Sequence, residues 1–181
     1  PISGGTCANC HGGGNFGGSV NITLRDGSNN PVSSYIPGQN YVLEIDVDNS
    51  SGSPAGFGAQ AVVLTGSNAN GGSMGTTITA NTRKTVINSR DYVEQSNVSS
   101  NGLFQINWTA PTTGTGTLTI FAAGNIVNGV GTTGDQVITG SIQISEAIVT
   151  SISYDQGSYW KNNIDLNPTI TGIKGSTFSD P

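Results

Sequence analysis

The chain holds two cysteines and one histidine, and all three lie within the pentapeptide Cys7-Ala8-Asn9-Cys10-His11. Random shuffling of the sequence would produce this arrangement roughly once in 16,000 times, so chance is a poor explanation. Two thiols separated by two residues and followed at once by an imidazole form the motif that attaches a c-type haem. The thiols of Cys7 and Cys10 add to the two haem vinyl groups, and His11 binds the iron as proximal ligand. The motif therefore predicts one covalently bound haem c.

Two other uses of these residues stay open. A Cys7–Cys10 disulfide would close a small loop in an oxidising compartment. A Cys/His metal site is also conceivable, although structural zinc takes four ligands and the chain has no further Cys or His to complete the set. A Ser-His-Asp hydrolase site would have to take His11 away from the motif, so a hydrolase is not expected, whereas a haem with an open sixth position would allow peroxidase-type chemistry.

The sixth ligand of the iron is not settled by the motif. Met74 is the only methionine, and we expect it in a flexible loop over residues 66–75 with no apolar neighbours. A thioether ligand raises the reduction potential of a haem and suits electron transfer, so Met74 is a candidate distal ligand. Its rivals are the amines of Lys84, Lys161 and Pro1, a water molecule and a partner's side chain. An open or water-bound position would permit small-ligand binding.

Glycines and aromatic residues are the other candidates for contact with a haem. Five glycines would let the backbone run close to a flat macrocycle, or would form a flexible leader: Gly12, Gly13, Gly14, Gly17 and Gly18. Five aromatic residues could line a haem pocket, although each is more simply interpreted as a residue of the hydrophobic core: Phe16, Tyr35, Phe57, Trp108 and Phe121. The acidic residues lack calcium-loop spacing and predict a solvated face: Asp26, Asp46, Asp48, Asp91 and Glu94.

Composition limits the fold that positions these residues. Gly, Ser, Thr and Asn supply 88 of the 181 residues, and 17 residues carry a formal charge. This excludes a coiled coil, which needs charged heptads, and disfavours helical bundles, because these four residue types are weak helix formers. Runs of Val, Ile and Thr together with 12 aromatic residues argue against disorder. The remaining class is an all-β fold with many turns.

Nine short segments show the alternation, or in one case the continuous run, of apolar residues that is typical of β-strands. They lie at 20–24, 41–48, 57–64, 76–80, 85–87, 92–95, 104–110, 118–122 and 137–144. The pattern predicts an Ig-like antiparallel β-sandwich over residues 19–147, preceded by a Gly-rich haem-attachment segment over residues 1–18. Loops rich in Asn and Gly are expected at 66–75 and 124–134. Residues 148–181 cannot bury a core of their own, so we expect a linker or the truncated start of a second Ig-like repeat.

The charge balance excludes nucleic acid as a partner, and the lengths of the apolar runs exclude a membrane span. The net charge is −5, and six Lys and Arg residues cannot build the basic patch that nucleic acid requires. No apolar run approaches the ~18 residues that span a bilayer, so no membrane span is predicted. Low charge with abundant Thr, Ser, Asn and Gly suits an exported protein, and we expect an extracellular or outer-membrane surface location.

Several motifs occur in the order in which one family has them: Gly4-Gly5-Thr6-Cys7-Ala8-Asn9-Cys10-His11, Tyr35-Ile36-Pro37-Gly38-Gln39-Asn40-Tyr41, Gly56-Phe57-Gly58-Ala59-Gln60, Trp108-Thr109-Ala110-Pro111, Phe121-Ala122-Ala123-Gly124-Asn125, Asn128-Gly129 and Gly134-Asp135. Over about residues 3–146 the chain resembles the choice-of-anchor V and reelin-like domains of exported bacterial proteins, many of them from Bacteroidetes. The resemblance implies a reelin-like β-sandwich with an N-terminal CxxCH, often on a protein with a C-terminal surface-sorting signal of the type IX secretion kind. We associate the family with a histidine where this chain has Gln95.

Two shorter resemblances concern the two ends. The haem pentapeptide is similar to that of cytochrome f, a β-sandwich cytochrome whose sixth ligand is its N-terminal amine, which keeps Pro1 among the candidates. Residues 150–178 resemble the first half of an Ig-like repeat from long Bacteroidetes surface adhesins, which implies that the chain is a piece of a larger surface protein.

Two functional hypotheses follow. The first is a monohaem c-type domain on an exported surface protein, working in electron transfer or in haem-based sensing with a redox partner. The second is a non-catalytic adhesion or structural module with a Cys7–Cys10 disulfide. Its partner would be a cell surface or further copies of itself, with fibre formation as one outcome.

Overall fold

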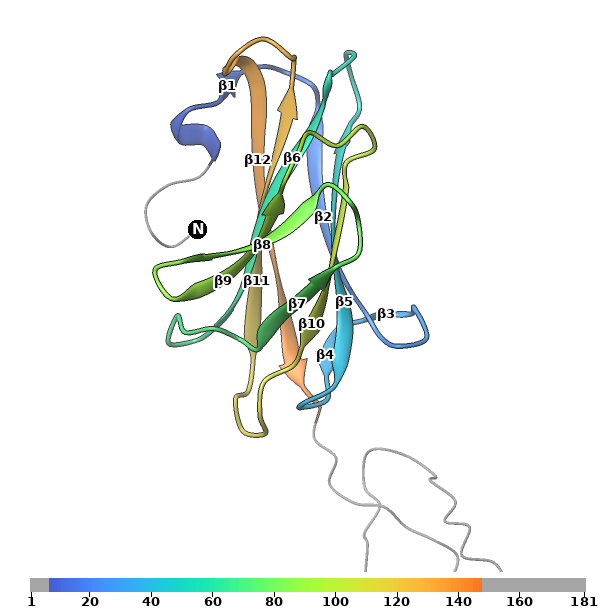
Figure 1. Ribbon diagram of the computed structural model, residues 1–181, viewed down its shortest axis with the longest axis vertical. Coiled ribbons are helices and arrows are strands. Elements are labelled where there is room, and N and C mark those ends of the chain that lie inside the picture. Colours follow the sequence, from blue (N-terminus) through green and yellow to red (C-terminus); the bar gives the residue numbers. More distant parts are fainter. Residues whose placement is uncertain (1–6, 148–181) are drawn as a thin grey trace, which may run out of the picture. The chain divides into compact units, whose positions relative to one another are not determined.

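The computed structural model describes residues 7–147 (Figure 1). The adhesin-like repeat expected at 148–181 lies outside the described residues, as do the candidate ligands Pro1 and Lys161. Within 7–147, no helix is long and apolar enough to cross a membrane.

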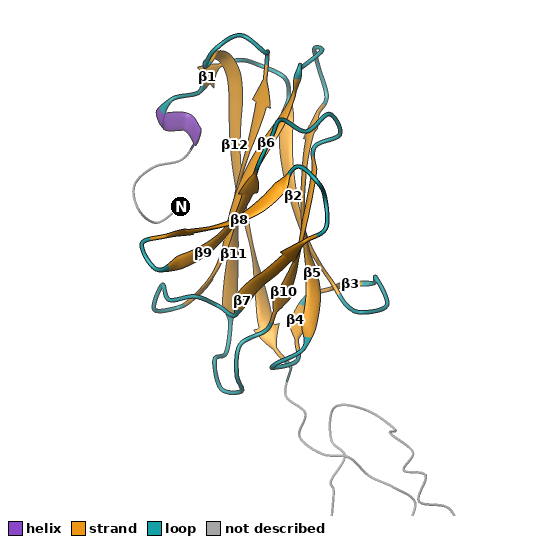
Figure 2. Ribbon diagram, viewed as in Figure 1, coloured by secondary structure: helices purple, strands orange, loops and turns teal. Residues whose placement is uncertain are grey.

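Two β-sheets form the described part of the chain (Figures 1 and 2). The seven-stranded sheet has the order β1 (Gly12–Gly13), β12 (Thr133–Glu146), β11 (Leu118–Val127), β6 (Gly56–Thr65), β9 (Arg90–Gln95) and β8 (Thr82–Ile87), with β4 (Ser34–Tyr35) also paired to β12. The five-stranded sheet has the order β3 (Pro31–Val32), β2 (Gly18–Arg25), β5 (Asn40–Asn49), β10 (Leu103–Thr109) and β7 (Ser73–Thr77). Every pair is antiparallel except the short β1–β12 and β12–β4 pairs. The predicted all-β sandwich is confirmed.

The core lies between the two sheets and follows the alternation of the sequence. In β5, Leu43, Ile45 and Val47 are buried, while the acidic residues between them face outward. This is the period of two that a half-buried strand requires. Trp108 of β10 is the largest fully buried side chain of the described residues, and the rings of Tyr35 and Tyr41 pack against it at centroid distances of 6.0 and 5.7 Å.

The structure corrects three sequence predictions about loops. Residues 66–75 do not form one long loop, because β7 begins at Ser73. The loop expected at 124–134 shrinks to residues 128–132, since β11 continues to Val127 and β12 begins at Thr133. The Gly-rich segment is not a free leader, because Gly12–Gly13 pairs with β12 and Gly18 opens β2. Glycine hides strands from a side-chain pattern, because it contributes no apolar face.

Glu146, the last residue of β12, binds the backbone of the loop that precedes β11. Its carboxylate accepts hydrogen bonds from the backbone N–H groups of Gly114 and Gly116, each at 2.8 Å, and these bonds hold its pKa below the ordinary 4.5. A lowered folded-state pKa stabilises the fold above the unfolded pKa, and this stabilisation is lost as pH falls through the folded value. Glu146→Gln should therefore lower the urea midpoint at pH 7, and its difference from wild type should shrink as pH falls below 4.5. A midpoint difference that stays constant from pH 7 to pH 3 would contradict this assignment.

Candidate functional site

The motif begins as a single tight turn on the outside of the seven-stranded sheet. Cys7–Asn9 form a 3-10 helix, η1, and the carbonyl of Cys7 accepts hydrogen bonds from the N–H groups of Cys10 and His11 at 3.2 and 2.9 Å. This helix lies against β11 and β12. Figure 2 shows it in purple beside β12, on the side away from the five-stranded sheet. The turn places both thiols and the imidazole within one short stretch of chain, as attachment to a single ligand requires.

The strand that follows the motif carries His11 to a partner far away in sequence. Gly12–Gly13 pair in parallel with the start of β12, and the N–H of Gly14 donates to the carbonyl of Asp135 at 2.8 Å. The side chain of His11 thereby reaches that of Asp135, with Nδ1 and Oδ2 2.6 Å apart. His11 stays 29% exposed, whereas the Asp135 side chain is fully buried. One imidazole nitrogen is thus engaged by a carboxylate, and Nε2 is left for another ligand.

Asp135 is held by the loop between β11 and β12. Its second oxygen, Oδ1, accepts the backbone N–H of Asn128 at 2.9 Å. The side-chain amide of Asn128 in turn donates to the carbonyl of Thr133 at 2.9 Å and accepts from the N–H of Val130 at 2.8 Å. A buried carboxylate is costly unless it is hydrogen-bonded, and here both of its oxygens have donors. The loop therefore holds the Asp135 carboxylate in place through contacts that do not involve His11.

Two glycines are required for this close approach. A Cβ on Gly14 would lie 2.4 Å from the carbonyl oxygen of Gly134, a distance that real side chains do not reach. Gly134 itself has a φ of +88°, in the region that favours glycine, and its Cβ would meet the amide of Asn128. Gly14 is therefore needed for β1 to pack closely against β12, and its presence does not require contact with a haem.

A second buried polar residue lies on the same face of the sheet as Asp135. Ile126 and Gly124 face the core, so Asn125 between them faces outward, toward the side on which η1 covers β11. Asn125 is 5% exposed, and its Oδ1 has no hydrogen-bond partner within residues 7–147. Buried amide oxygens are normally satisfied, so this one indicates a polar group or water that completes the site.

The two thiols differ in environment. Cys10 is exposed and Cys7 is half-buried, and both are free thiols. Burial raises the pKa of Cys7 above its ordinary value of 9.0, and the negative charge of Glu94 adds to the effect. A redox-active CxxC pair needs a thiol with a lowered pKa, so Cys7 has the opposite character. Across residues 7–147, no three His, Cys, Asp or Glu side chains gather as a metal site would require.

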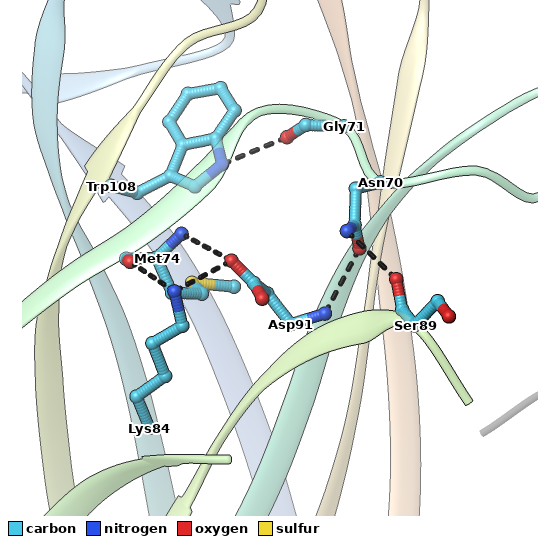
Figure 3. Close-up of polar contacts among 7 residues, drawn as sticks. All are labelled: Asn70, Gly71, Met74, Lys84, Ser89, Asp91 and Trp108. Atoms are coloured by element: carbon cyan, nitrogen blue, oxygen red, sulfur yellow. Dashed lines mark hydrogen bonds and ion pairs between the residues drawn. The ribbon is translucent and has the colours of Figure 1, made fainter. Parts of the chain in front are cut away.

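The structure places Met74 in the core, contrary to the expectation of a flexible loop without apolar neighbours. Met74 lies on β7, is 5% exposed and belongs to the main apolar cluster, while η1 lies against β11 and β12. Figure 3 shows Lys84 beside it: Nζ donates to the Met74 carbonyl at 3.0 Å and forms an ion pair with Asp91 at 2.8 Å. The N–H of Met74 donates to the same carboxylate at 3.4 Å. The structure therefore does not bring Met74 or Lys84 to the motif.

Replacing the sulfur of Met74 tests whether it binds iron. Met74→Leu conserves volume, so it should cost less than about 1.5 kcal/mol of unfolding free energy. If Met74 is a core residue only, the absorption spectrum of the haem-loaded variant should match that of wild type in both oxidation states. Loss of low-spin bands in the variant would restore Met74 as the distal ligand.

The other aromatic and acidic candidates have mostly structural places. Tyr35, Phe57 and Trp108 belong to the core, Phe16 packs partly against it, and Phe121 lies with Val62, Leu64 and Tyr92 on the outer face of the larger sheet. The acidic residues are partly paired rather than simply solvated: Glu94 binds Arg83 and Asp91 binds Lys84.

Comparisons with known proteins come from solved structures alone, because no family model and no curated protein matches the chain. The human F-spondin reeler domain is 19% identical over 69% of this chain and 91% of that chain, with a TM-score of 0.46. A cohesin module from a Clostridium perfringens family 33 glycoside hydrolase is 10% identical over 73% and 98%, with a TM-score of 0.49. A conjugative transposon lipoprotein from Bacteroides eggerthii is 12% identical over 69% and 97%, with a TM-score of 0.35.

The structural neighbours thus include reelin-type domains, the type of domain that the sequence motifs resemble. At identities below 25% and TM-scores below 0.5, these likenesses carry no argument about a ligand, a partner or an activity. The case for function rests on the side chains at the motif.

Sequence reasoning missed two residues of this site, Asp135 and Asn125. Both stand in the short motifs that carry the family resemblance, but no role was assigned to either. Asp135 follows a glycine in a Gly-rich stretch and looks like an ordinary turn residue. Only the burial of its carboxylate distinguishes it, and burial is not visible in sequence.

Proposed function

We propose that residues 7–147 form a c-type monohaem module. Cys7 and Cys10 are the covalent anchors, and His11 is the proximal iron ligand through Nε2. In each anchoring reaction the thiol S–H adds across a vinyl C=C bond, forming one S–C and one C–H bond with no leaving group. Haem supplies a redox-active iron, so the expected work is one-electron transfer with a redox partner, or sensing of a small ligand.

The observation that carries the proposal is the contact between His11 Nδ1 and the buried Asp135 carboxylate at 2.6 Å. Metal-binding histidines nearly always donate their second ring N–H to a carboxylate or carbonyl, which orients the ring and makes the ligating nitrogen more basic. A chain that used Cys7 and Cys10 only as a disulfide would have no need for this arrangement at His11. The donor set and the geometry therefore fit a haem at the motif.

The module is proposed to act outside the cytoplasm, on an exported surface protein. The support is compositional: 88 of 181 residues are Gly, Ser, Thr or Asn and only 17 carry a formal charge. A c-type haem is anchored by two thioether bonds, so its retention does not depend on binding equilibrium alone. That property suits a site facing a large external volume, where a dissociated cofactor would be lost.

Intact mass tests the proposal. The full chain is produced in cells with a working haem-maturation system, and mass and visible absorption are measured on the purified protein. A mass gain of one haem with a Soret band is expected, and the Cys7→Ser, Cys10→Ser double variant should show neither. A colourless wild type with the unmodified mass would overturn the proposal.

The same measurement decides the alternative of a non-catalytic adhesion or structural module. In that case wild type would lose the mass of two hydrogens through a Cys7–Cys10 disulfide and carry no haem. Binding to a surface, or self-assembly, would then survive in the double variant.

A further inference from the structure

We propose that Asp135 is a positioning residue that holds His11 as the Nδ1–H tautomer and lowers the reduction potential of the iron bound to His11; the second half rests on the proposed haem module. The first half concerns the protein alone. Both halves start from one contact, which joins residues 124 positions apart in sequence.

The contact with a carboxylate favours one position for the imidazole proton. An ionised carboxylate can only accept hydrogen bonds, so Nδ1 must be the donor to Oδ2. In a neutral imidazole the other nitrogen then holds the lone pair. Nε2 is therefore the atom presented to a metal, and the ring cannot turn without breaking a 2.6 Å hydrogen bond. The parallel β1–β12 pairing and the Asn128 N–H hold the two sides of this contact in place.

Within residues 7–147, no Lys or Arg side chain forms an ion pair with Asp135. Its hydrogen-bond partners there are His11 and the backbone N–H of Asn128. The positive side chains between residues 7 and 147 are engaged elsewhere: Arg25 with Glu44, Arg83 with Glu94, Lys84 with Asp91, and Arg90 with the carbonyl of Asn68. A fully buried negative charge is weakly screened, so it acts strongly on any charge that develops near His11.

A negative charge behind the proximal ligand favours the more positive oxidation state. Reduction adds one electron, supplied by a redox partner or an electrode, and converts ferric to ferrous iron without making or breaking a bond. The Asp135 carboxylate and a more basic Nε2 both stabilise the ferric form. The buried position of Met74 removes the ligand that would raise the potential. The module is therefore built for a low potential.

The tautomer is measured on the full chain produced without haem maturation. Nitrogen-15 NMR, recorded at a pH high enough that the imidazole carries a single proton, should show Nδ1 protonated and Nε2 unprotonated in wild type. Asp135→Ala should move the equilibrium toward the Nε2–H form. An Nε2–H tautomer in wild type would overturn the proposed role of Asp135 in setting the tautomer. This test uses wild type alone, so it holds even if the alanine variant does not fold.

The potential is measured on the haem-loaded protein. Asp135→Asn keeps a hydrogen-bond acceptor of the same shape and removes the charge. It should raise the midpoint potential, shifting the ferric-to-ferrous ratio at a fixed solution potential by tenfold or more, which corresponds to 59 mV. Asp91→Asn is the matched control, because it removes an equally negative side chain that is 18% exposed and paired with Lys84. Its potential should equal that of wild type.

The outcomes separate this inference from the proposed function. If wild type carries no haem, the proposed function fails, while NMR still decides the tautomer. If wild type carries haem and Asp135→Asn leaves the potential unchanged, or shifts it no more than Asp91→Asn does, the proposed effect on potential is wrong. If Asp135→Asn cannot be loaded with haem, a wild-type potential in the range of Met-ligated cytochromes overturns the second half.

Discussion

A Gly14→Ala variant is expected to lose the contact between His11 and Asp135 although neither residue is changed. The new Cβ would lie 2.4 Å from the carbonyl oxygen of Gly134, so β1 must move away from β12. Overpacking of this kind costs about 1–3 kcal/mol, which the chain can avoid by detaching the short strand. The amide of residue 14, which donates to Asp135 in wild type, should exchange with solvent about tenfold faster for each 1.4 kcal/mol lost.

The matched control is Gly12→Ala, because a Cβ on Gly12 would meet no atom within 4 Å. This variant should keep the wild-type exchange rates and the Nδ1–H tautomer of His11. In Gly14→Ala the tautomer should shift as it does in Asp135→Ala, and the haem-loaded protein should show a raised potential. Equal behaviour of the two alanine variants would mean that β1 does not position His11.

Trp108→Ala is expected to have the largest effect on stability. Trp108 is 1% exposed, packs against Tyr35 and Tyr41, and donates from Nε1 to the carbonyl of Gly71 at 2.9 Å (Figure 3). Removing a buried tryptophan side chain costs about 3–5 kcal/mol, through lost burial and the cavity left behind. At about 2–4 °C per kcal/mol for a chain of this size, Tm should fall by roughly 6–20 °C.

Trp108→Phe separates packing from the hydrogen bond. The phenyl ring keeps contacts with Tyr35 and Tyr41, while the carbonyl of Gly71 loses its donor, so the loss should be well below that of the alanine variant. Both variants are compared by calorimetry. A decrease in Tm of under 3 °C for Trp108→Ala would show that the packing between the sheets is looser than described.

The alternation of apolar and polar residues located most of the sandwich from sequence alone. The strand predicted at 41–48 lies within β5, and residues 104–109 of the strand predicted at 104–110 lie in β10. A half-buried strand shows its two faces in alternate residues, which is why this pattern can be recognised. Strand β1, which consists of Gly12–Gly13, was not predicted, and the strand predicted at 76–80 covers only the last two residues of β7. The glycines and serine in these strands give no alternation of apolar and polar residues, although Met74 itself is buried in the core.

The site was predictable in its local part only. Cys7, Cys10 and His11 lie in one pentapeptide, so their common chemistry could be read from spacing. Asp135 could not be found in that way, because its role depends on a parallel strand pair that joins residues 124 positions apart in sequence. Asn125 was hidden for a different reason: it lies in a segment predicted to be loop, and only its place in β11 shows that its amide is buried.

The sequence distance between His11 and Asp135 also sets the time that separates their synthesis on the ribosome. A ribosome adds about 5–20 residues per second, so roughly 6–25 s separate the synthesis of the motif from that of the aspartate 124 positions later. Throughout that interval β1 has no partner strand, and Cys7 has no sandwich to bury it. The motif is therefore complete before the residue that orients its histidine has been made, and His11 acquires its fixed orientation only when β12 pairs with β1.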